Sequence, residues 1–433
     1  MIVEFSVKNF RSIKDLQTIS FSTTGLKSSE KHIEVDNNNI ATDGGMKLFK
    51  TLGIYGANAS GKSNIIKALD IFIKTITREA SSQSNMGSLC DPFLYQEKAE
   101  DTESFFQITL IIKNIKYRYG LTVKKNSNPK HENDTNYSQE IVTSEWLYGR
   151  KEKNMVVLFQ NKGNKIDNKL PNKEKIPDSL SYNHSLFITH AAAFDNNGSC
   201  KTIRDYLRGM TTSNFNISHD KFRWMSINYL ENENNKDNKN DFLELLSVFN
   251  LSYDDAVLQK DSDSKKNDVF PQEKIILSKN YKNKNKESIS VNLNLSYHES
   301  AGTQKLFDLA GLLLRAFNLP VPAFIILDEI DSNFHPSLLI KLISLFNNPA
   351  INKSNSQLLF TSHDTNIMSP DIMRRDQFYF TEKNEDRSTR LYSLADLKGI
   401  RNDADFAKQY LAGYYGALPV LKDYKLNLQE QND

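Results

Sequence analysis

Two short segments carry the residue types that bind and cleave a nucleoside triphosphate. Residues 56–63, Gly-Ala-Asn-Ala-Ser-Gly-Lys-Ser, fit the pattern G-x-x-x-x-G-K-[ST]. In such a loop, backbone N–H groups surround the phosphates, the lysine reaches the terminal phosphates, and the hydroxyl holds Mg²⁺. Much later in the chain, Asp328 and Glu329 end an apolar run. Their carboxylates can support Mg²⁺ and polarise an attacking water. Together the segments predict a nucleoside triphosphatase site built from distant parts of the chain.

The phosphate loop needs an element on each side to hold it. Residues 48–55 form an apolar stretch that predicts a strand before the loop, and residues 64–73 continue as an apolar-rich helix. The N-terminus of that helix would face the phosphates and favour their charge. The loop residues expected to bind ATP are Gly56, Asn58, Ala59, Ser60, Gly61, Lys62, Ser63 and Asn64.

The acidic pair should lie beside a histidine. Residues 323–327 and 357–361 are short apolar runs of the kind found in buried parallel strands. Neighbouring parallel strands end at the same edge of a sheet, so His363 should lie near Asp328 and Glu329 and could contact the γ-phosphate. The non-catalytic alternatives are that the acidic pair only caps the next element and that the histidine has a structural role.

A third segment could also meet an anion. Ser300-Ala-Gly-Thr-Gln304 precedes a helical stretch over residues 305–317, which places a hydroxyl, a glycine amide and a helix N-terminus together. Taken alone, small residues in this position more often only cap the helix.

The rest of the chain predicts a second lobe and an insertion. Residues 1–21 read as a hairpin, 105–123 as two strands turning at Lys113-Asn114, and 140–147 with 156–159 as further strands, which together predict an antiparallel lobe. Residues 161–286 are rich in Asn and Lys, with helical patterns over 201–210 and 242–246. This segment predicts a compact inserted arm, and the lack of sustained heptads argues against a long coiled coil.

Bulk properties are those of an ordinary soluble protein. The chain has 433 residues, 39% apolar and 25% charged, with a formal net charge of +2. Any contact with DNA or RNA would therefore have to be a local patch. The lysines at 279, 282, 284 and 286 could bind phosphates, although Lys/Asn alternation is more typical of a solvated loop. No apolar run is long enough to span a membrane and no signal-peptide pattern opens the chain, so we expect a cytoplasmic protein without membrane contact.

In chain order these motifs resemble those of ABC-type ATPases of the SMC/Rad50/RecF branch. The segments that carry the resemblance are residues 9–12 (Asn-Phe-Arg-Ser), 56–63, 300–304, 328–329, Asp331 and His363. The resemblance implies an α/β fold: an ABC-ATPase head with a mixed β-sheet core, flanking helices and an antiparallel β lobe, plus an inserted, mainly helical arm. The expected division is 1–160 for the first half of the head, 161–290 for the inserted arm or dimerisation domain, and 291–433 for the second half and the tail.

The same resemblance assigns roles to individual residues. It makes Glu329 the catalytic base, His363 the switch residue, and Asp328 with Ser63 the Mg²⁺ ligands. Further ATP contacts are implied for Arg11, Ser12 and, from a second subunit, Ser300, Gly302 and Asp331. Gln96 lies in the interval where this branch has a Mg²⁺-contacting glutamine, but an exposed polar glutamine fits the sequence equally well.

A narrower resemblance is to OLD-like and AAA_15-type abortive-infection ATPases, including RloA-like ones. It rests on residues 9–12, 56–64, 145–148, 299–304, 331–336 and 410–419. It implies ATP and Mg²⁺ as cofactors, at least a homodimer, and a role in defence against phage. Only 70 residues follow His363, too few for a TOPRIM nuclease domain, so the effector would be a separate protein such as a TOPRIM or RloB-like nuclease. The alternatives are a RecF- or Rad50-like repair ATPase acting directly on DNA, and a scaffold that binds ATP but rarely hydrolyses it.

Overall fold

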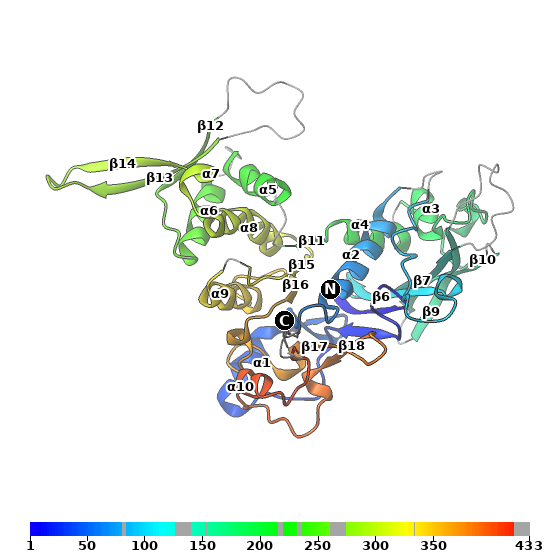
Figure 1. Ribbon diagram of the computed structural model, residues 1–433. Helices are drawn as coiled ribbons and strands as arrows, with labels where there is room; N and C mark the ends of the chain where they lie inside the picture. Colours follow the sequence, from blue (N-terminus) through cyan, green and yellow to red (C-terminus); the bar gives the residue numbers. More distant parts are fainter. Residues whose placement is uncertain are drawn as a thin grey trace, which may run out of the picture.

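The computed structural model describes most of the chain (Figure 1). The described residues are 1–79, 84–125, 140–151, 154–163, 165–196, 198–214, 220–231, 236–259, 274–332 and 334–419. Part of the expected tail, residues 420–433, lies outside them. None of the described helices is both long and apolar enough to cross a membrane.

A six-stranded core sheet joins segments from both ends of the chain. Its order is β11 (Thr211–Asn214), β15 (Phe324–Asp328), β16 (Gln357–Thr361), β5 (Thr51–Gly56), β17 (Phe378–Lys383) and β18 (Thr389–Ser393). The first five strands are parallel and β18 is antiparallel. Every residue of β5, β15 and β16 is buried, as expected for strands covered on both faces. The two apolar runs predicted as neighbouring parallel strands are confirmed as β15 and β16.

A seven-stranded antiparallel sheet forms the predicted second lobe. Its order is β10 (Lys165–Asn168), β9 (Asn154–Lys162), β8 (Glu140–Lys151), β7 (Ile115–Lys125), β6 (Ser104–Ile112), β1 (Ile2–Lys8) and β2 (Gln17–Ser20). The turn between β6 and β7 falls at Lys113 and Asn114 as predicted, and both residues have a positive φ.

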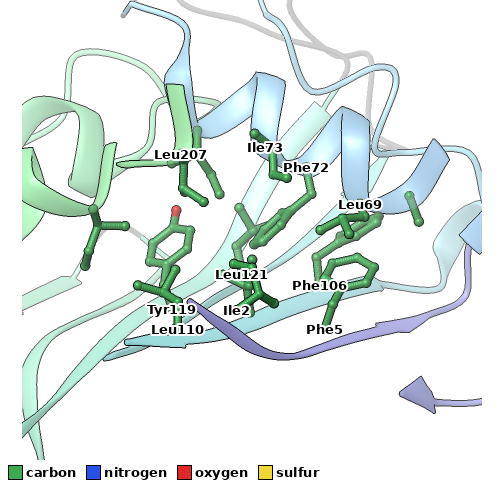
Figure 2. Close-up of a cluster of buried hydrophobic side chains, with 14 of the residues drawn as sticks. Ile2, Phe5, Leu69, Phe72, Ile73, Phe106, Leu110, Tyr119, Leu121 and Leu207 are labelled. Carbon is green, nitrogen blue, oxygen red and sulfur yellow. The ribbon is translucent and has the colours of Figure 1, made fainter. Parts of the chain in front are cut away.

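Helix α2 (Lys62–Thr77) is fixed between these two sheets. Figure 2 shows Leu69, Phe72 and Ile73 of α2 directed at side chains of the antiparallel sheet. The Phe72 ring stacks on the Phe106 ring, with the ring centroids 5.7 Å apart and the ring planes 14° from parallel. The same buried cluster includes Leu52 and Ile54 of β5. Because both sides of α2 are packed, the loop at its N-terminus is held rigidly.

The predicted strand over residues 48–55 is two strands. β4 (Met46–Phe49) pairs with β3 (Ile40–Asp43) in a separate hairpin, and β5 begins at Thr51. Between them the Lys50 side chain is buried, and its ammonium donates to the carbonyls of Asn38 (2.7 Å) and Asn347 (3.0 Å). Burial lowers the pKa of Lys50 to about 8. The lysine thus links α1 (Ile33–Asn39) and α9 (Pro336–Asn347) at the point where β4 ends and β5 begins.

Residues 161–290 do not form one inserted helical arm in the described part of the chain. β10 and β11 belong to the two sheets above, and α3 (Phe187–Phe194) and α4 (Ser199–Arg208) pack on α2. Sequence reasoning missed this because four-residue polar strands such as β11 have no periodicity of their own and form only against a neighbour. The three-part domain division stays a prediction.

The remaining part of residues 161–290 packs with the helix that begins at Ser300-Ala-Gly-Thr-Gln304, which we call the small-residue motif. We call this unit the side lobe. It contains α5 (Asp220–Glu231), α6 (Lys236–Val248), β12 (Asp255–Gln259), β13 (Lys274–Lys282), β14 (Ser288–Asn294), α7 (Leu295–His298) and α8 (Ala301–Asn318), at the upper left of Figure 1. Arg223 of α5 makes a two-point ion pair with Asp308 of α8, at 2.9 and 3.2 Å, and ties the two helices together.

Glu145 begins residues 145–148, one of the segments that carry the narrower resemblance, and it has a structural role. Its buried carboxylate accepts hydrogen bonds from the N–H groups of Phe187 (2.6 Å) and Ile188 (2.9 Å) and from the Tyr119 hydroxyl (2.9 Å). Burial raises the pKa of Glu145 to about 7, although these hydrogen bonds lower it. Glu145 therefore anchors the start of α3 on the antiparallel sheet. At the far end of the chain, α10 (Phe406–Leu411) places Tyr410 against Phe380 of the core sheet.

Candidate active site

The phosphate loop turns sharply from β5 into α2 and needs its glycines. Gly56 and Gly61 have φ values of +149° and +114°. A Cβ on Gly56 would overlap the backbone oxygen of Thr381, and one on Gly61 would overlap the Thr389 hydroxyl. The neighbouring strands β17 and β18 thus approach the loop too closely for any other residue. Asn58 and Ala59 lie exposed at its crest.

Lys62 lies across the loop that precedes it. Its buried ammonium donates to the carbonyl oxygens of Gly56 (2.8 Å) and Ala57 (3.1 Å). Burial lowers the pKa of Lys62, whereas the charges of Asp328, Asp331 and Glu329 raise it. The structure therefore brings the lysine of the first motif close to the carboxylates of the second, as predicted.

Thr361, at the end of β16, fixes the acidic pair at the end of β15. Its hydroxyl donates to Asp328 Oδ1 (2.5 Å) and accepts from the backbone N–H of Glu329 (2.7 Å). Glu329 has a φ of +55°, a strained conformation that non-glycine residues adopt mainly at turns and functional sites. Sequence reasoning missed Thr361, although it is the last residue of a predicted strand beside the acidic pair.

His363 and Asp331 lie at the same edge of the core sheet. The backbone N–H of His363 donates to Asp331 Oδ2 at 3.2 Å. Partial burial lowers the pKa of the His363 imidazole, and the positive charge of Lys62 lowers it further, against the opposing effect of Asp331, Glu329 and Asp328. The imidazole is thus favoured in its neutral form. Asp331 Oδ1 is buried and, in the described residues, accepts no hydrogen bond.

The oxygen donors of the site fit Mg²⁺. The hydroxyl of Ser63 and the carboxylate of Asp328 are hard ligands, and the orphaned Asp331 oxygen adds a further acceptor nearby. Within the described residues, no three His, Cys, Asp or Glu side chains could hold a metal ion by themselves. A Mg²⁺ ion bound mainly through substrate phosphates and water would need only one or two protein ligands.

The N-terminal turn lies against the phosphate loop through Ser12. The Ser12 hydroxyl accepts from the side chain of Asn64 (2.7 Å) and is 2.7 Å from the hydroxyl of Thr389. Thr389 in turn donates to the backbone oxygen of Ser60 (2.9 Å). The structure therefore brings Ser12, Ser60 and Asn64 together, with Thr389 as the link, and their contact with ATP stays a prediction.

Arg11 and Gln96 brace the same turn from outside. Arg11 forms an ion pair with Asp91 (Nε to Oδ2, 2.8 Å) and has a φ of +51°. The side chain of Gln96 donates to Asn9 Oδ1 at 2.8 Å. These contacts give both residues a structural role, and their contact with ATP or Mg²⁺ stays a prediction.

The segment 413–419 also reaches the phosphate loop. The N–H of Ala57 donates to the carbonyl oxygen of Ala417 at 2.9 Å, and the Tyr392 hydroxyl donates to the carbonyl oxygen of Tyr415 at 2.6 Å. This contact places the segment over residues 410–419 beside the phosphate loop. No local sequence pattern could reveal it, because the two segments are far apart in the chain.

The small-residue motif begins α8 on the side lobe. Ser300 caps the helix, with its hydroxyl accepting from the N–H of Thr303 at 3.2 Å, and it is exposed. Gly302 lies in the first turn. In Figure 1 the side lobe stands apart from α2. The motif thus belongs to a different unit of the fold from the two sheets that enclose α2.

We expect Thr361→Val to lower the rate of hydrolysis by about 10- to 100-fold with little change in ATP affinity, as is typical when a supporting contact to a catalytic group is lost. Valine keeps the shape but removes the hydroxyl that positions Asp328 and Glu329. Steady-state phosphate release measures the effect. Thr361→Ser keeps the hydroxyl and should stay near wild type. Equal rates for Thr361→Val and wild type would show that the hydroxyl has no positioning role.

The core sheet, phosphate loop and acidic strand end define a P-loop nucleoside triphosphatase. Residues 52–369 match the family model described as "AAA domain, putative AbiEii toxin, Type IV TA system". The match covers well over half of the chain, and the protein belongs to this family of P-loop ATPases linked to abortive infection. No curated protein matches the chain.

Proposed function

We propose that the chain is an ATP-driven switch in which two heads enclose two ATP molecules and separate after hydrolysis. The observation that carries this proposal is the meeting of Lys62, Asp328, Glu329 and His363 at the carboxyl ends of β5, β15 and β16. Proteins with an open parallel sheet bind their ligands at the edge where the carboxyl ends of the strands lie. Membership of the family implies nucleoside triphosphatase activity.

Each residue at this edge has a separate task in hydrolysis. The loop amides and Lys62 bind the β- and γ-phosphates, and Glu329 accepts a proton from the attacking water. The water oxygen bonds to the γ-phosphorus as the bond to the bridging oxygen breaks, so that ADP leaves with that electron pair. His363 donates a hydrogen bond to the γ-phosphate and loses it after hydrolysis. Ser63 and Asp328 would hold Mg²⁺, which neutralises phosphate charge when bound.

A second chain enters the proposal because the motif that begins α8 lies in the side lobe, which stands apart from α2 in Figure 1. Ser300 is exposed, and the helix N-terminus behind it offers N–H groups to an anion. A two-fold dimer would bring Ser300 and Gly302 of each chain onto the ATP of the other. Asp331, which contacts His363, would connect the two sites across the dimer.

We further propose a cytoplasmic role in defence against phage. In this role the ATPase senses infection and regulates a separate effector, a TOPRIM or RloB-like nuclease. The support is the link of the family to abortive infection and toxin–antitoxin systems, together with the OLD-like and RloA-like resemblance of the motifs.

Sedimentation of the Glu329→Gln protein tests the dimer. In ATP and Mg²⁺ it should sediment as a dimer. Adding Ser300→Arg should return it to the smaller species, because the long arginine side chain would fill the space in which the Ser300 hydroxyl meets the phosphate. Ser247→Arg, at an exposed serine of α6 in the same lobe, is the matched control and should still dimerise. Dimerisation that is unchanged by Ser300→Arg, or absent in all three proteins, would contradict the proposal.

A further inference from the structure

The β13–β14 hairpin pairs with β12 over residues 274–278, and beyond them it extends from the side lobe into solvent as a two-stranded ribbon (Figure 1). Its strands pair in antiparallel register, with Lys279 opposite Val291, Tyr281 opposite Ile289 and Lys282 opposite Ser288. Apart from Asn283, every residue from 279 to 292 is exposed. The sequence favoured a solvated loop here, but the structure places Lys279 and Lys282 within a strand.

The ribbon is strongly basic in a chain that is nearly neutral. Residues 274–294 contain five lysines and one glutamate, a formal charge of +4, whereas the whole chain sums to only +2. The lysines at 279, 282, 284 and 286 gather at its outer end. The nearby acidic side chains are engaged: Glu287 accepts from the Asn283 amide (2.7 Å), and Asp254 accepts from the N–H of Asn280 (2.6 Å). The tip therefore carries a concentrated positive charge.

The two faces of the ribbon differ in chemistry. Because side chains alternate along a strand, the register separates them into two sets. One face is wholly polar and consists of Ser278, Asn280, Lys282, Ser288, Ser290 and Asn292. The other carries Lys279 beside the apolar side chains of Tyr281, Ile289 and Val291, of which Tyr281 is 52% exposed. The polar face presents the hydroxyl and amide groups that hydrogen-bond to base edges and phosphates.

We propose that this ribbon binds double-stranded DNA, with its polar face in the major groove and its lysines on the flanking phosphates. The major groove of B-form DNA admits a two-stranded β-ribbon. A-form RNA is a poorer fit because its major groove is too narrow and deep for side chains to read. The density of lysines at the tip favours a polyanion over a protein surface.

The position of the ribbon connects it to the ATPase site. β14 ends at Asn294, whose side chain caps α7 by accepting from the N–H groups of Ser296 (2.9 Å) and Tyr297 (3.3 Å). Ser300 follows only a few residues later and begins α8. The base of the ribbon is thus joined to the motif assigned to the second ATP by a short segment of chain, whereas its lysines lie at the outer end. DNA binding itself does not depend on the proposed ATPase cycle.

Fluorescence anisotropy with a labelled DNA duplex of about 20 base pairs tests the proposal over about 50 to 200 mM salt. The variant carries Lys→Gln at 279, 282, 284 and 286. We expect it to bind about 10- to 100-fold more weakly at low salt, with the slope of log Kd against log salt reduced by about 2 to 4. Lys→Arg at the same four positions should keep the binding.

Two comparisons make the result specific. Lys→Gln at the exposed lysines 162, 165, 173 and 175, near β10 at the opposite side of Figure 1, removes the same charge and should leave affinity and slope unchanged. Duplex RNA should bind more weakly than duplex DNA. Equal loss in both charge variants, or duplex binding that is unaffected by the ribbon variant, overturns the proposal. So does binding of no nucleic acid by the wild-type chain, which would assign the Tyr281 face to a protein partner.

Discussion

Glu329→Gln should slow ATP hydrolysis by about 10²- to 10⁴-fold, the usual contribution of a general base. Glutamine has nearly the same shape but cannot take the proton from the attacking water. ATP affinity should stay near that of wild type, because the phosphate loop and Asp328 are untouched. Single-turnover hydrolysis together with equilibrium ATP binding separates the two quantities.

Two other results would have distinct meanings for Glu329. Normal hydrolysis by Glu329→Gln would show that another group is the base. Equal and negligible rates in wild type and variant would identify a scaffold that binds ATP without turning it over. Glu174→Gln, at an exposed glutamate in the short helical turn Lys173–Lys175 that follows β10, controls for the loss of one carboxylate and should hydrolyse normally.

Lys62→Ala should raise the Kd for ATP by about 10²- to 10⁴-fold, since each hydrogen bond between charged groups contributes about 1.5 to 3 kcal/mol and two are lost. The buried ammonium is also the positive charge that faces Asp328, Asp331 and Glu329. Removing it would leave these carboxylates to repel the phosphates. Titration calorimetry measures the affinity directly.

Lys67→Ala is the matched control for this prediction. Lys67 lies on the same helix, α2, but is exposed. Its loss should leave ATP binding unchanged. Similar affinities for Lys62→Ala and Lys67→Ala would mean that residues 56–63 do not form the phosphate site.

Local patterns in the sequence predicted much of the core sheet. The runs over residues 323–327 and 357–361 became β15 and β16 almost residue for residue, because continuous apolar stretches bounded by turn residues suit strands covered on both faces. Once those strands are neighbours, the meeting of Asp328, Glu329 and His363 follows from the shared edge of the sheet.

Other features depend on contacts between distant segments and have no local signal. β11 is a polar tetrapeptide that becomes a strand only beside β15. Thr361 orients the acidic pair across two strands, and Ala417 reaches Ala57 from near the end of the chain. The Asn- and Lys-rich stretches suggested a single arm, whereas tertiary pairing divides them between two sheets and the side lobe.

Mixing two inactive variants tests the shared site most directly. The Lys62→Ala chain cannot bind ATP at its own phosphate loop. The Ser300→Arg chain cannot complete the ATP site of its neighbour. A mixed dimer would keep one intact site, formed by the loop of one chain and the α8 motif of the other. At equal concentrations we expect hydrolysis to rise clearly above that of either variant alone, to at most about one half of the wild-type rate, because each mixed dimer has one working site of two. No recovery above the separate variants would contradict a site shared between two chains.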